Sequence, residues 1–292
     1  MTAVTGKAMR AVFILCGLAI ILFLFGILYI LLSNSMPGLI ELGLGPFFAD
    51  DRWNPGAYGE PTYSLLNMIY GTLMVTLGAL IFAVPIGVAA AAYLAEIASP
   101  WEREFFKPIV EILAGVPSVV LGFFGLVVLA PLIARVFNLN SGLNAFNGAL
   151  LVGIMALPAI ITLAEDAITA VPKEYRHASL ALGGTRWQTI WKITIPAAFS
   201  GITASAMLGM GRAIGETMTV LMVTGNMVAR PDSFLDSVRT LSAGIAIDIG
   251  DVVFNSTHFH ALFVAGLLLF LITFAVNLLA DILIQRKPEV SK

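Results

Sequence analysis

The sequence predicts an all-α, polytopic membrane protein with six transmembrane helices. Hydrophobic residues make up 59% of the 292 residues and charged residues only 12%, and this charged share is about half that of a typical soluble domain. Six long apolar stretches alternate with more polar segments. A helix of about 20 residues crosses the roughly 30 Å hydrocarbon core of a bilayer, so each stretch is long enough for one span.

The first span is expected from Ala11 to Leu32, directly after Lys7 and Arg10. Ser33 and Pro37 follow the apolar run and are expected to end the helix. The run is longer than the apolar core of a cleaved signal peptide, and no small-residue cleavage site follows it. We therefore expect this span in the mature protein.

The remaining spans are expected at residues 65–98, 109–137, 148–170, 197–223 and 262–284. Membrane helices tolerate proline when neighbouring groups satisfy the freed carbonyls. Kinks are therefore expected at four prolines inside or at the edges of these spans: Pro85, Pro117, Pro131 and Pro158. The chain divides into residues 1–64, with the first span and an outer loop, a five-span core at 65–285, and a tail at 286–292.

The basic residues predict that both termini are cytoplasmic, because Lys and Arg are enriched in the inner segments of membrane proteins. With the N-terminus inside, the inner segments hold Lys7, Arg10, Arg103, Lys107, Lys173, Arg176, Arg186, Lys192, Arg286, Lys287 and Lys292. The outer segments hold Arg52, Arg230 and Arg239 together with Asp50, Asp51, Glu60, Asp232, Asp236, Asp248 and Asp251. Glu165 and Asp166, near the inner end of the fourth span, are expected to reach solvent or pair with basic residues of the segment 172–196, and the same is expected of Glu96 and Glu111.

Several functions are excluded by the charge balance and the reactive residues. The formal net charge of −2 gives no basic excess for nucleic acid. Cys16 is the single cysteine, and His258 and His260 have no further ligand at convincing spacing, so neither a metal nor another cofactor is expected. The sequence has no Gly-x4-Gly-Lys-Ser/Thr phosphate loop, so we expect no ATP hydrolysis by this chain and no enzyme activity of its own.

The segment between the fourth and fifth spans, residues 172–196, is longer than a simple turn requires. It is expected to form a helix, a break at Gly183 and Gly184, and a second amphipathic piece ending at Pro196. Apolar anchors mixed with positive charge fit either a helix lying in the lipid interface or a helix docked on a partner protein.

The fifth expected span combines small residues with two charges. Small residues recur every fourth position at Gly201, Ser205, Gly209 and Ala213, which predicts close packing against another helix. Arg212 and Glu216 are four residues apart and would share one helix face. They could form a buried pair that fixes the position of the helix, or Arg212 could contact a tetrahedral oxyanion while Glu216 holds it or acts as a gate.

The spacing in the 172–196 segment resembles a known motif. His177-Ala178-Ser179, three residues, Gly183, nine residues and Ile193-Thr194-Ile195-Pro196 resemble the EAA loop of ABC-importer permeases, with the pattern Glu-Ala-Ala-x3-Gly-x9-Ile-x-Leu-Pro. The resemblance implies the type I importer permease fold and a coupling helix that docks on a cytoplasmic ATPase. The sequence differs from the pattern at His177, where the family usually has Glu, and at Ile195, where it has Leu.

Two further segments resemble the PstC-type permeases of phosphate ABC importers. Residues 211–218 read Gly-Arg-Ala-Ile-Gly-Glu-Thr-Met, and the PstC type has Gly-Arg-Ala-Leu-Gly-Glu-Thr-Met. Residues 113–125 resemble a second stretch of that type, with Leu121 where Tyr is frequent. The resemblance implies that Arg212, Glu216 and Thr217 lie in the translocation pathway.

This resemblance implies a permease that passes inorganic phosphate across the inner (plasma) membrane. The implied partners are a PstA-like second permease, two PstB-like ATPase subunits and an external PstS-like phosphate-binding protein. Two alternatives remain. One is an importer of another oxyanion, such as sulfate or molybdate, and the other is a secondary transporter or channel, which would have inverted repeats.

Overall fold

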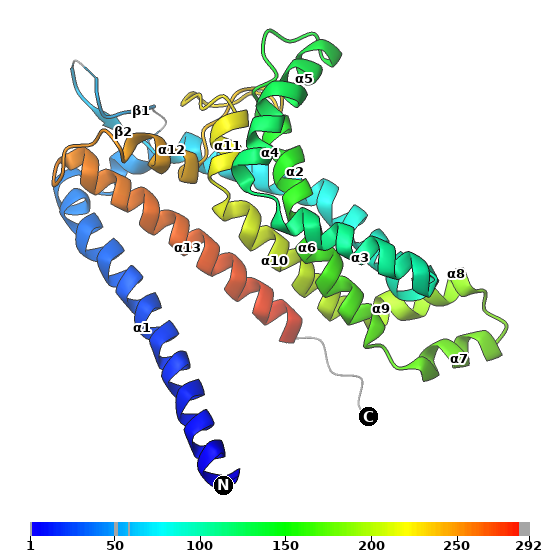
Figure 1. Cartoon of the computed structure of the whole chain (residues 1–292). Helices are drawn as coiled ribbons and strands as arrows, with labels where there is room; N and C mark the ends of the chain where they lie inside the picture. The colour runs from blue at the N-terminus through cyan, green and yellow to red at the C-terminus, as the bar shows by residue number, and fades with distance from the viewer. Residues whose placement is uncertain (1, 50–51, 58, 286–292) are drawn as a thin grey trace.

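The membrane-spanning helices pack around a central pair, α2 (Leu66–Ala92) and α6 (Ala145–Thr169), in the computed structural model (Figure 1). The structure describes residues 2–49, 52–57 and 59–285. The expected tail at 286–292, with Arg286, Lys287 and Lys292, lies outside the described residues, as do Asp50 and Asp51. The predicted all-α membrane fold is confirmed.

The other helices follow in chain order: α1 (Thr2–Leu42), α3 (Pro100–Gly115), α4 (Ser118–Phe124), α5 (Ala130–Val136), α7 (Lys173–Ala181), α8 (Arg186–Thr189), α9 (Ile195–Ala197), α10 (Phe199–Gly215), α11 (Met218–Val223), α12 (Leu241–Asp248) and α13 (Thr257–Gln285). π-helical turns at Tyr93–Ile97, Gly125–Leu129 and Ile190–Thr194 extend or join helices, and a 3-10 turn covers Gly45–Phe48. Strands β1 (Trp53–Asn54) and β2 (Thr62–Tyr63) form a short antiparallel hairpin.

Five helical stretches in the described part are long and apolar enough to cross a membrane: Met9–Leu42, Leu66–Ile97, Ser118–Val136, Ala145–Thr169 and Thr257–Leu279. A sixth crossing results if Arg186–Ala197 and Phe199–Gly215, which meet at a bend of 70°, form one broken span. Figure 1 shows α7, α8 and the start of α1 toward one end of the bundle and the β1–β2 hairpin and α12 toward the other. We call these the loop end and the hairpin end.

The first span does not end at Ser33, so that boundary was wrong. Helix α1 continues through Pro37 to Leu42. Asn34 Nδ2 donates to the Ile30 carbonyl at 2.8 Å and Ser35 Oγ donates to the Leu32 carbonyl at 3.2 Å. Because these polar side chains bond back to the preceding turn, they are compatible with a continuing helix.

The third span begins at Ser118 rather than at Ile109. Pro117 disfavours a helical conformation of the residue before it, and Val116 has extended backbone angles, with ψ at 126°. The apolar stretch is therefore divided between α3, which ends at Gly115, and α4.

The fifth span is broken as well, and the single helix expected over 197–223 was wrong. Helix α10 ends at Gly215, Glu216 is extended with ψ at 126°, and α11 begins at Met218. The expectation that Arg212 and Glu216 share a helix face fails, because only Arg212 is helical.

Small residues hold the bundle together at close range. A Cβ atom at Gly87 of α2 would lie 2.7 Å from Ile160 Cγ2, and one at Gly209 of α10 would lie 2.7 Å from Ile160 Cδ1. Ile160 of α6 is fully buried between these two helices. The predicted packing role of the Gly201, Ser205, Gly209 and Ala213 stripe is confirmed.

Helix α1 packs beside α13 and otherwise diverges from the bundle (Figure 1). His260 Nδ1 of α13 lies 2.7 Å from the Asn34 carbonyl of α1, and a Cβ atom at Gly38 would lie 3.0 Å from His260 Cβ. Toward its N-terminus, α1 exposes large apolar side chains such as Phe13, Leu22 and Phe23.

Candidate functional site

The segment between α6 and α10 is a helix-turn-helix loop at the loop end, as the sequence predicts. Helix α7 ends where Gly183 takes a left-handed conformation, with φ at +84°. Thr185 then caps α8: its side chain accepts from the Gln188 N–H at 3.2 Å, and the Gln188 side chain accepts from the Thr185 N–H at 2.9 Å. Ser179 Oγ lies 2.8 Å from Thr189 Oγ1 and ties the two helices together.

Arg176 fixes this loop to the bundle. Its Nε donates to Glu96 Oε1 at 2.7 Å, and its terminal nitrogens donate to the carbonyls of Val171 at 2.6 Å and Ile168 at 2.9 Å. The guanidinium thus satisfies carbonyls at the end of α6 and neutralises a carboxylate beyond the end of α2. Arg176 therefore links α7 to the ends of the two central helices.

The loop exposes its remaining apolar side chains. Leu182 is 90% exposed and Trp187 62% exposed, and Tyr175, Leu180 and Trp191 are also exposed. Of the residues that the motif singled out, His177, Ala178, Gly183 and Pro196 are exposed, whereas Ser179 and Ile193 are half-buried. The loop thus presents a surface of apolar and aromatic groups.

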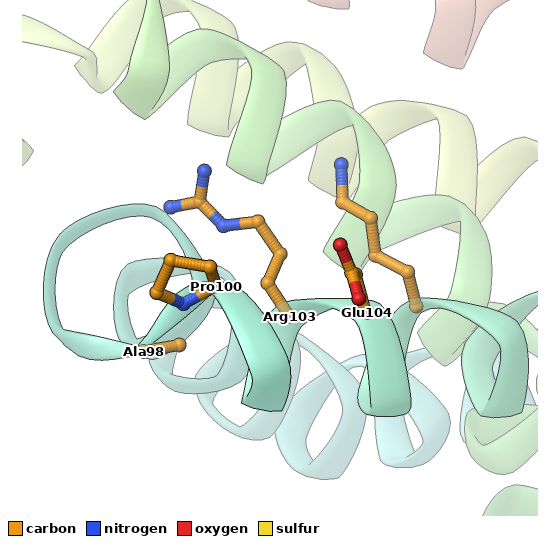
Figure 2. Close-up of a pocket in the computed structure, with 5 residues that line it drawn as sticks. Ala98, Pro100, Arg103 and Glu104 are labelled. Atoms are coloured by element: carbon orange, nitrogen blue, oxygen red, sulfur yellow. The ribbon is translucent and has the colours of Figure 1, made fainter.

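Helix α3 lies next to this loop end and carries a depression of 440 Å³ lined by Ala98, Pro100, Arg103, Glu104 and Lys107. Figure 2 shows Arg103 and Glu104 rising from α3 beside the turn at Ala98 and Pro100. Lys107 Nζ lies 3.0 Å from Glu165 Oε1 of α6, whose side chain is buried. Lys107 is therefore tied to α6, and Arg103 is tied to the carbonyls of Leu94 and Ala95.

The start of α3 is fixed by a capping box. Glu102 Oε2 accepts from the Ser99 N–H at 2.7 Å, and Ser99 Oγ accepts from the Glu102 N–H at 3.4 Å. The Ser99 N–H, which bonds the carboxylate, is the main cause of a lowered pKa of Glu102.

Arg212, Glu216 and Thr217 lie at the break between α10 and α11. The Arg212 side chain is exposed and has no hydrogen bond or ion pair within the described residues. Glu216 Oε1 instead accepts from the Thr219 N–H at 3.3 Å, and Thr217 Oγ1 donates to the Gly215 carbonyl at 3.2 Å. One of the two interpretations of these charges was a buried pair between Arg212 and Glu216. Within the described residues, this pair does not form.

The two segments that carry the family resemblance meet at this break. Buried Thr219 of α11 donates its hydroxyl to the Ser118 carbonyl of α4 at 3.1 Å. A Cβ atom at Gly125 would lie 2.7 Å from Val223 Cγ1, and one at Gly122 would lie 2.9 Å from Met222 Sδ. Two broken helices thus lie side by side, an arrangement that membrane proteins tolerate where backbone is buried in protein or lines an aqueous path.

Sequence reasoning missed several of these contacts. Glu96 pairs with Arg176 of the loop, but Glu165 pairs with Lys107 of α3, which is distant in sequence. The Ser99–Glu102 cap carries the readable Ser-x-x-Glu signature. The Thr219–Ser118 contact joins positions 101 residues apart, and no local pattern indicates it.

Two broken helices lie side by side, and a helix-turn-helix loop lies at one end of the bundle. Curated relatives include "Probable ABC transporter permease protein YqgH" of Bacillus subtilis (strain 168), which is 36% identical over 280 residues covering 95% of this chain and 90% of that protein. The "Phosphate transport system permease protein PstC" of Xylella fastidiosa (strain Temecula1) is 33% identical over 259 residues covering 82% and 78%.

The fold is similar to a solved bacterial ABC transporter involved in the import of the acidic polysaccharide alginate. The TM-score is 0.63 at 16% identity, and the match covers 97% of this chain and 99% of that one. Residues 83–287 match the family described as binding-protein-dependent transport system inner membrane component. The chain belongs to this family.

Proposed function

We propose that this chain is a permease subunit of an ATP-driven importer that carries inorganic phosphate across the inner (plasma) membrane. The observation that carries the proposal is Arg212, an exposed arginine with no described partner beside two adjoining helix breaks. Arg212 lies in the last turn of α10, and charged residues within membrane segments normally face a bundle interior or an aqueous path. The similarity to PstC permeases supports phosphate as the anion.

Arg212 suits this substrate because a planar guanidinium can donate two parallel hydrogen bonds to a tetrahedral oxyanion. Thr217 adds a hydroxyl at the same break. Glu216 fixes the start of α11 by accepting a hydrogen bond from the Thr219 N–H. The pathway role that we assign to Glu216 is therefore to maintain the helix break beside Arg212. It does not neutralise the charge of Arg212.

The loop formed by α7 and α8 is proposed to couple this pathway to a cytoplasmic ATPase. His177, Ala178, Ser179, Gly183, Ile193 and Pro196 carry the motif, and the apolar side chains at Leu182, Trp187 and Trp191 are exposed for docking. ATP hydrolysis then resides in the partner chain. Because Arg176 ties α7 to the ends of α2 and α6, a movement of the ATPase groove would reach the bundle core.

The proposed assembly pairs this chain with a second, PstA-like permease. Two PstB-like ATPase subunits would bind at the loop end, and a PstS-like binding protein would deliver phosphate at the hairpin end. This assignment places both termini in the cytoplasm, in line with the basic residues of the inner segments.

The test is purification from native membrane with identification of the co-purifying chains, followed by uptake of labelled phosphate into proteoliposomes. An ATPase pair, a second six-span permease and ATP-dependent uptake are the expected results. Competition by sulfate or molybdate at equal concentration would instead favour a permease for another oxyanion. Uptake driven by an ion gradient in a homodimer that has no ATPase would reject the proposal.

A further inference from the structure

A cavity of 460 Å³ opens at the hairpin end, and none of Arg212, Glu216 and Thr217 lines it. This volume is within the range of small-molecule sites. Four separate segments line it: the loop into β1, the segment after α11, α12 and the start of α13. The lining residues are Arg52, Trp53, Asn54, Pro55, Val228, Arg239, Asp248 and His258.

Asp248 organises one wall of this cavity. Its Oδ2 accepts from Trp53 Nε1–H at 2.6 Å and lies 3.5 Å from His258 Nε2, and its Oδ1 lies 3.7 Å from Arg239 Nη1. Trp53 itself is 4% exposed and packs edge-on against His258, with ring centroids 5.8 Å apart. The carboxylate is therefore held in one orientation by groups from three segments.

Arg239 retains hydrogen-bonding capacity. Its Nε donates to the Asn226 carbonyl at 3.0 Å, which fixes the plane of the guanidinium. Within the part of the chain that the structure describes, its terminal nitrogens make no hydrogen bond, and His258 Nε2 is buried without one. Arg52 also lines the cavity, so guanidinium groups from two segments face it. A guanidinium that is fixed in place and has N–H groups left over favours an oxyanion.

The carboxylate restricts which oxyanion fits. A deprotonated Asp can only accept hydrogen bonds, and it repels an anion oxygen that carries no proton. Hydrogen phosphate carries a P–OH group that can donate to Asp248, whereas sulfate at neutral pH carries no proton. Arg239 and Asp248 together therefore match a protonated tetrahedral oxyanion and disfavour sulfate.

We propose that this cavity is a receiving site for hydrogen phosphate, separate from the Arg212 break. The inference rests on the proposed function for its orientation, which places the hairpin end outside, and for its substrate. The charged groups are recessed, with side-chain exposures of 17% for Arg239 and 14% for Asp248. Such recessed groups are reached more readily by a small anion than by a folded protein surface.

The test uses the purified full-length chain in nanodiscs of zwitterionic lipid. The assay uses a triple variant that keeps Trp53 as its one tryptophan: Trp101→Phe, Trp187→Phe and Trp191→Phe. Because the Trp53 indole N–H is bonded to Asp248, the fluorescence emission of Trp53 reports on changes at this wall of the cavity. Phosphate should produce a saturable change, and sulfate at equal ionic strength should not. The proposal would be overturned if the emission showed no saturable change up to about 10 mM phosphate, a concentration tenfold above a weak millimolar Kd. The same titration curve with sulfate would also overturn it.

Variants separate the anion site from a structural cluster. Arg239→Gln should weaken phosphate binding about tenfold or more, and Arg239→Lys should weaken it less. Arg230→Gln is the matched control, because Arg230 lies over the Tyr70 ring at 5.2 Å and does not line the cavity. Asp248→Asn keeps an acceptor for Trp53 and should allow sulfate to bind. Equal phosphate affinity in Arg239→Gln and Arg230→Gln would contradict the site.

Uptake by the assembled complex distinguishes this inference from the proposed function. If the complex imports phosphate while Trp53 does not respond to it, the receiving site is rejected and the proposed function stands. A Trp53 response to the external binding protein without a response to free phosphate would likewise reject it and assign the cavity to a protein contact. Absence of ATP-dependent phosphate uptake by the complex rejects the proposed function itself.

Discussion

At the scale of single residues, Arg212 differs from Arg103, Arg176 and Arg239 in what surrounds it. Arg103 and Arg176 are committed to carbonyls at helix ends, and Arg239 is held by Asn226. Arg212 makes no such bond within the described chain, although it belongs to a membrane helix. A charge in this position needs an aqueous path, an anion or a group from a partner subunit.

We expect Arg212→Gln to abolish most phosphate uptake while the complex still assembles. Arg212→Lys should recover part of the uptake, because an ammonium lacks the planar fork. Since Glu216 bonds to the Thr219 N–H rather than to Arg212, adding Glu216→Gln to Arg212→Gln should not restore uptake. The measurement is uptake at matched membrane abundance, and near wild-type uptake in the double variant would make Arg212 a structural residue.

The sequence indicated Arg212 and Glu216 as candidate pathway residues, but it did not predict how they are arranged in space. Arg212 and Glu216 were identified because charges are rare in apolar spans. Their separation was not predicted, because an apolar run carries no signal for the extended conformation at Glu216. That break is stabilised by Ser242 Oγ of α12, which donates to the Glu216 carbonyl at 2.8 Å across 26 positions of sequence.

At the scale of elements, the turn between α7 and α8 contains a glycine in a left-handed backbone conformation. Gly183 has φ at +84°, and a Cβ atom there would meet nothing within 4 Å. A side chain at position 183 would therefore meet no steric clash, and backbone strain decides which residue is tolerated there. The left-handed conformation costs an L-residue roughly 1–2 kcal/mol.

Gly183→Val should shift the angle between α7 and α8 and reduce coupled uptake severalfold while leaving membrane insertion intact. Gly183→Asn is the matched control, because Asn tolerates positive φ, and it should keep most of the coupling. ATPase activity and uptake measured together in the reconstituted complex test this expectation. If both variants couple normally, the loop geometry is unimportant for coupling.

Two glycines of α10 differ in how closely other helices pack against them. A Cβ atom at Gly209 would lie 2.7 Å from Ile160, which Gly87 confines from the other side, whereas one at Gly211 would lie 3.5 Å from Asn277 Oδ1. Gly209→Ala should destabilise the detergent-purified protein by about 1–3 kcal/mol through overpacking. Gly211→Ala should leave its thermal midpoint close to wild type. Equal midpoints for the two variants would contradict the packing assignment.

Helices were predicted better than their interruptions. The span at Leu66–Ile97 matches the expected 65–98, because a long apolar run specifies a membrane helix directly. The end of α1 was misplaced because polar residues and proline often end helices in water. Here Asn34 and Ser35 bond back to the preceding turn, and the helix continues through Pro37. The four-residue period of small side chains on α10 carried a packing signal that the structure confirms.

At the scale of the whole molecule, the two ends differ in what they expose. The loop end presents aromatic side chains such as Trp187 and Trp191. The hairpin end presents the cavity around Asp248 and Arg239. If the loop end docks on an ATPase, these ends lie on opposite sides of the membrane, with the loop end in the cytoplasm.

Cysteine labelling tests this orientation, because Cys16 is the single cysteine and Cys16→Ser gives a background without thiols. Ala181 at the end of α7 and Gly250 after α12 are both exposed. In intact cells, a membrane-impermeant maleimide should label Gly250→Cys but not Ala181→Cys, and permeabilisation should allow both to react. The Cys16→Ser background alone should not react in either condition. Labelling of Ala181→Cys in intact cells would place the loop end outside, where no ATPase could reach it, and would remove the basis for ATP-driven coupling through α7.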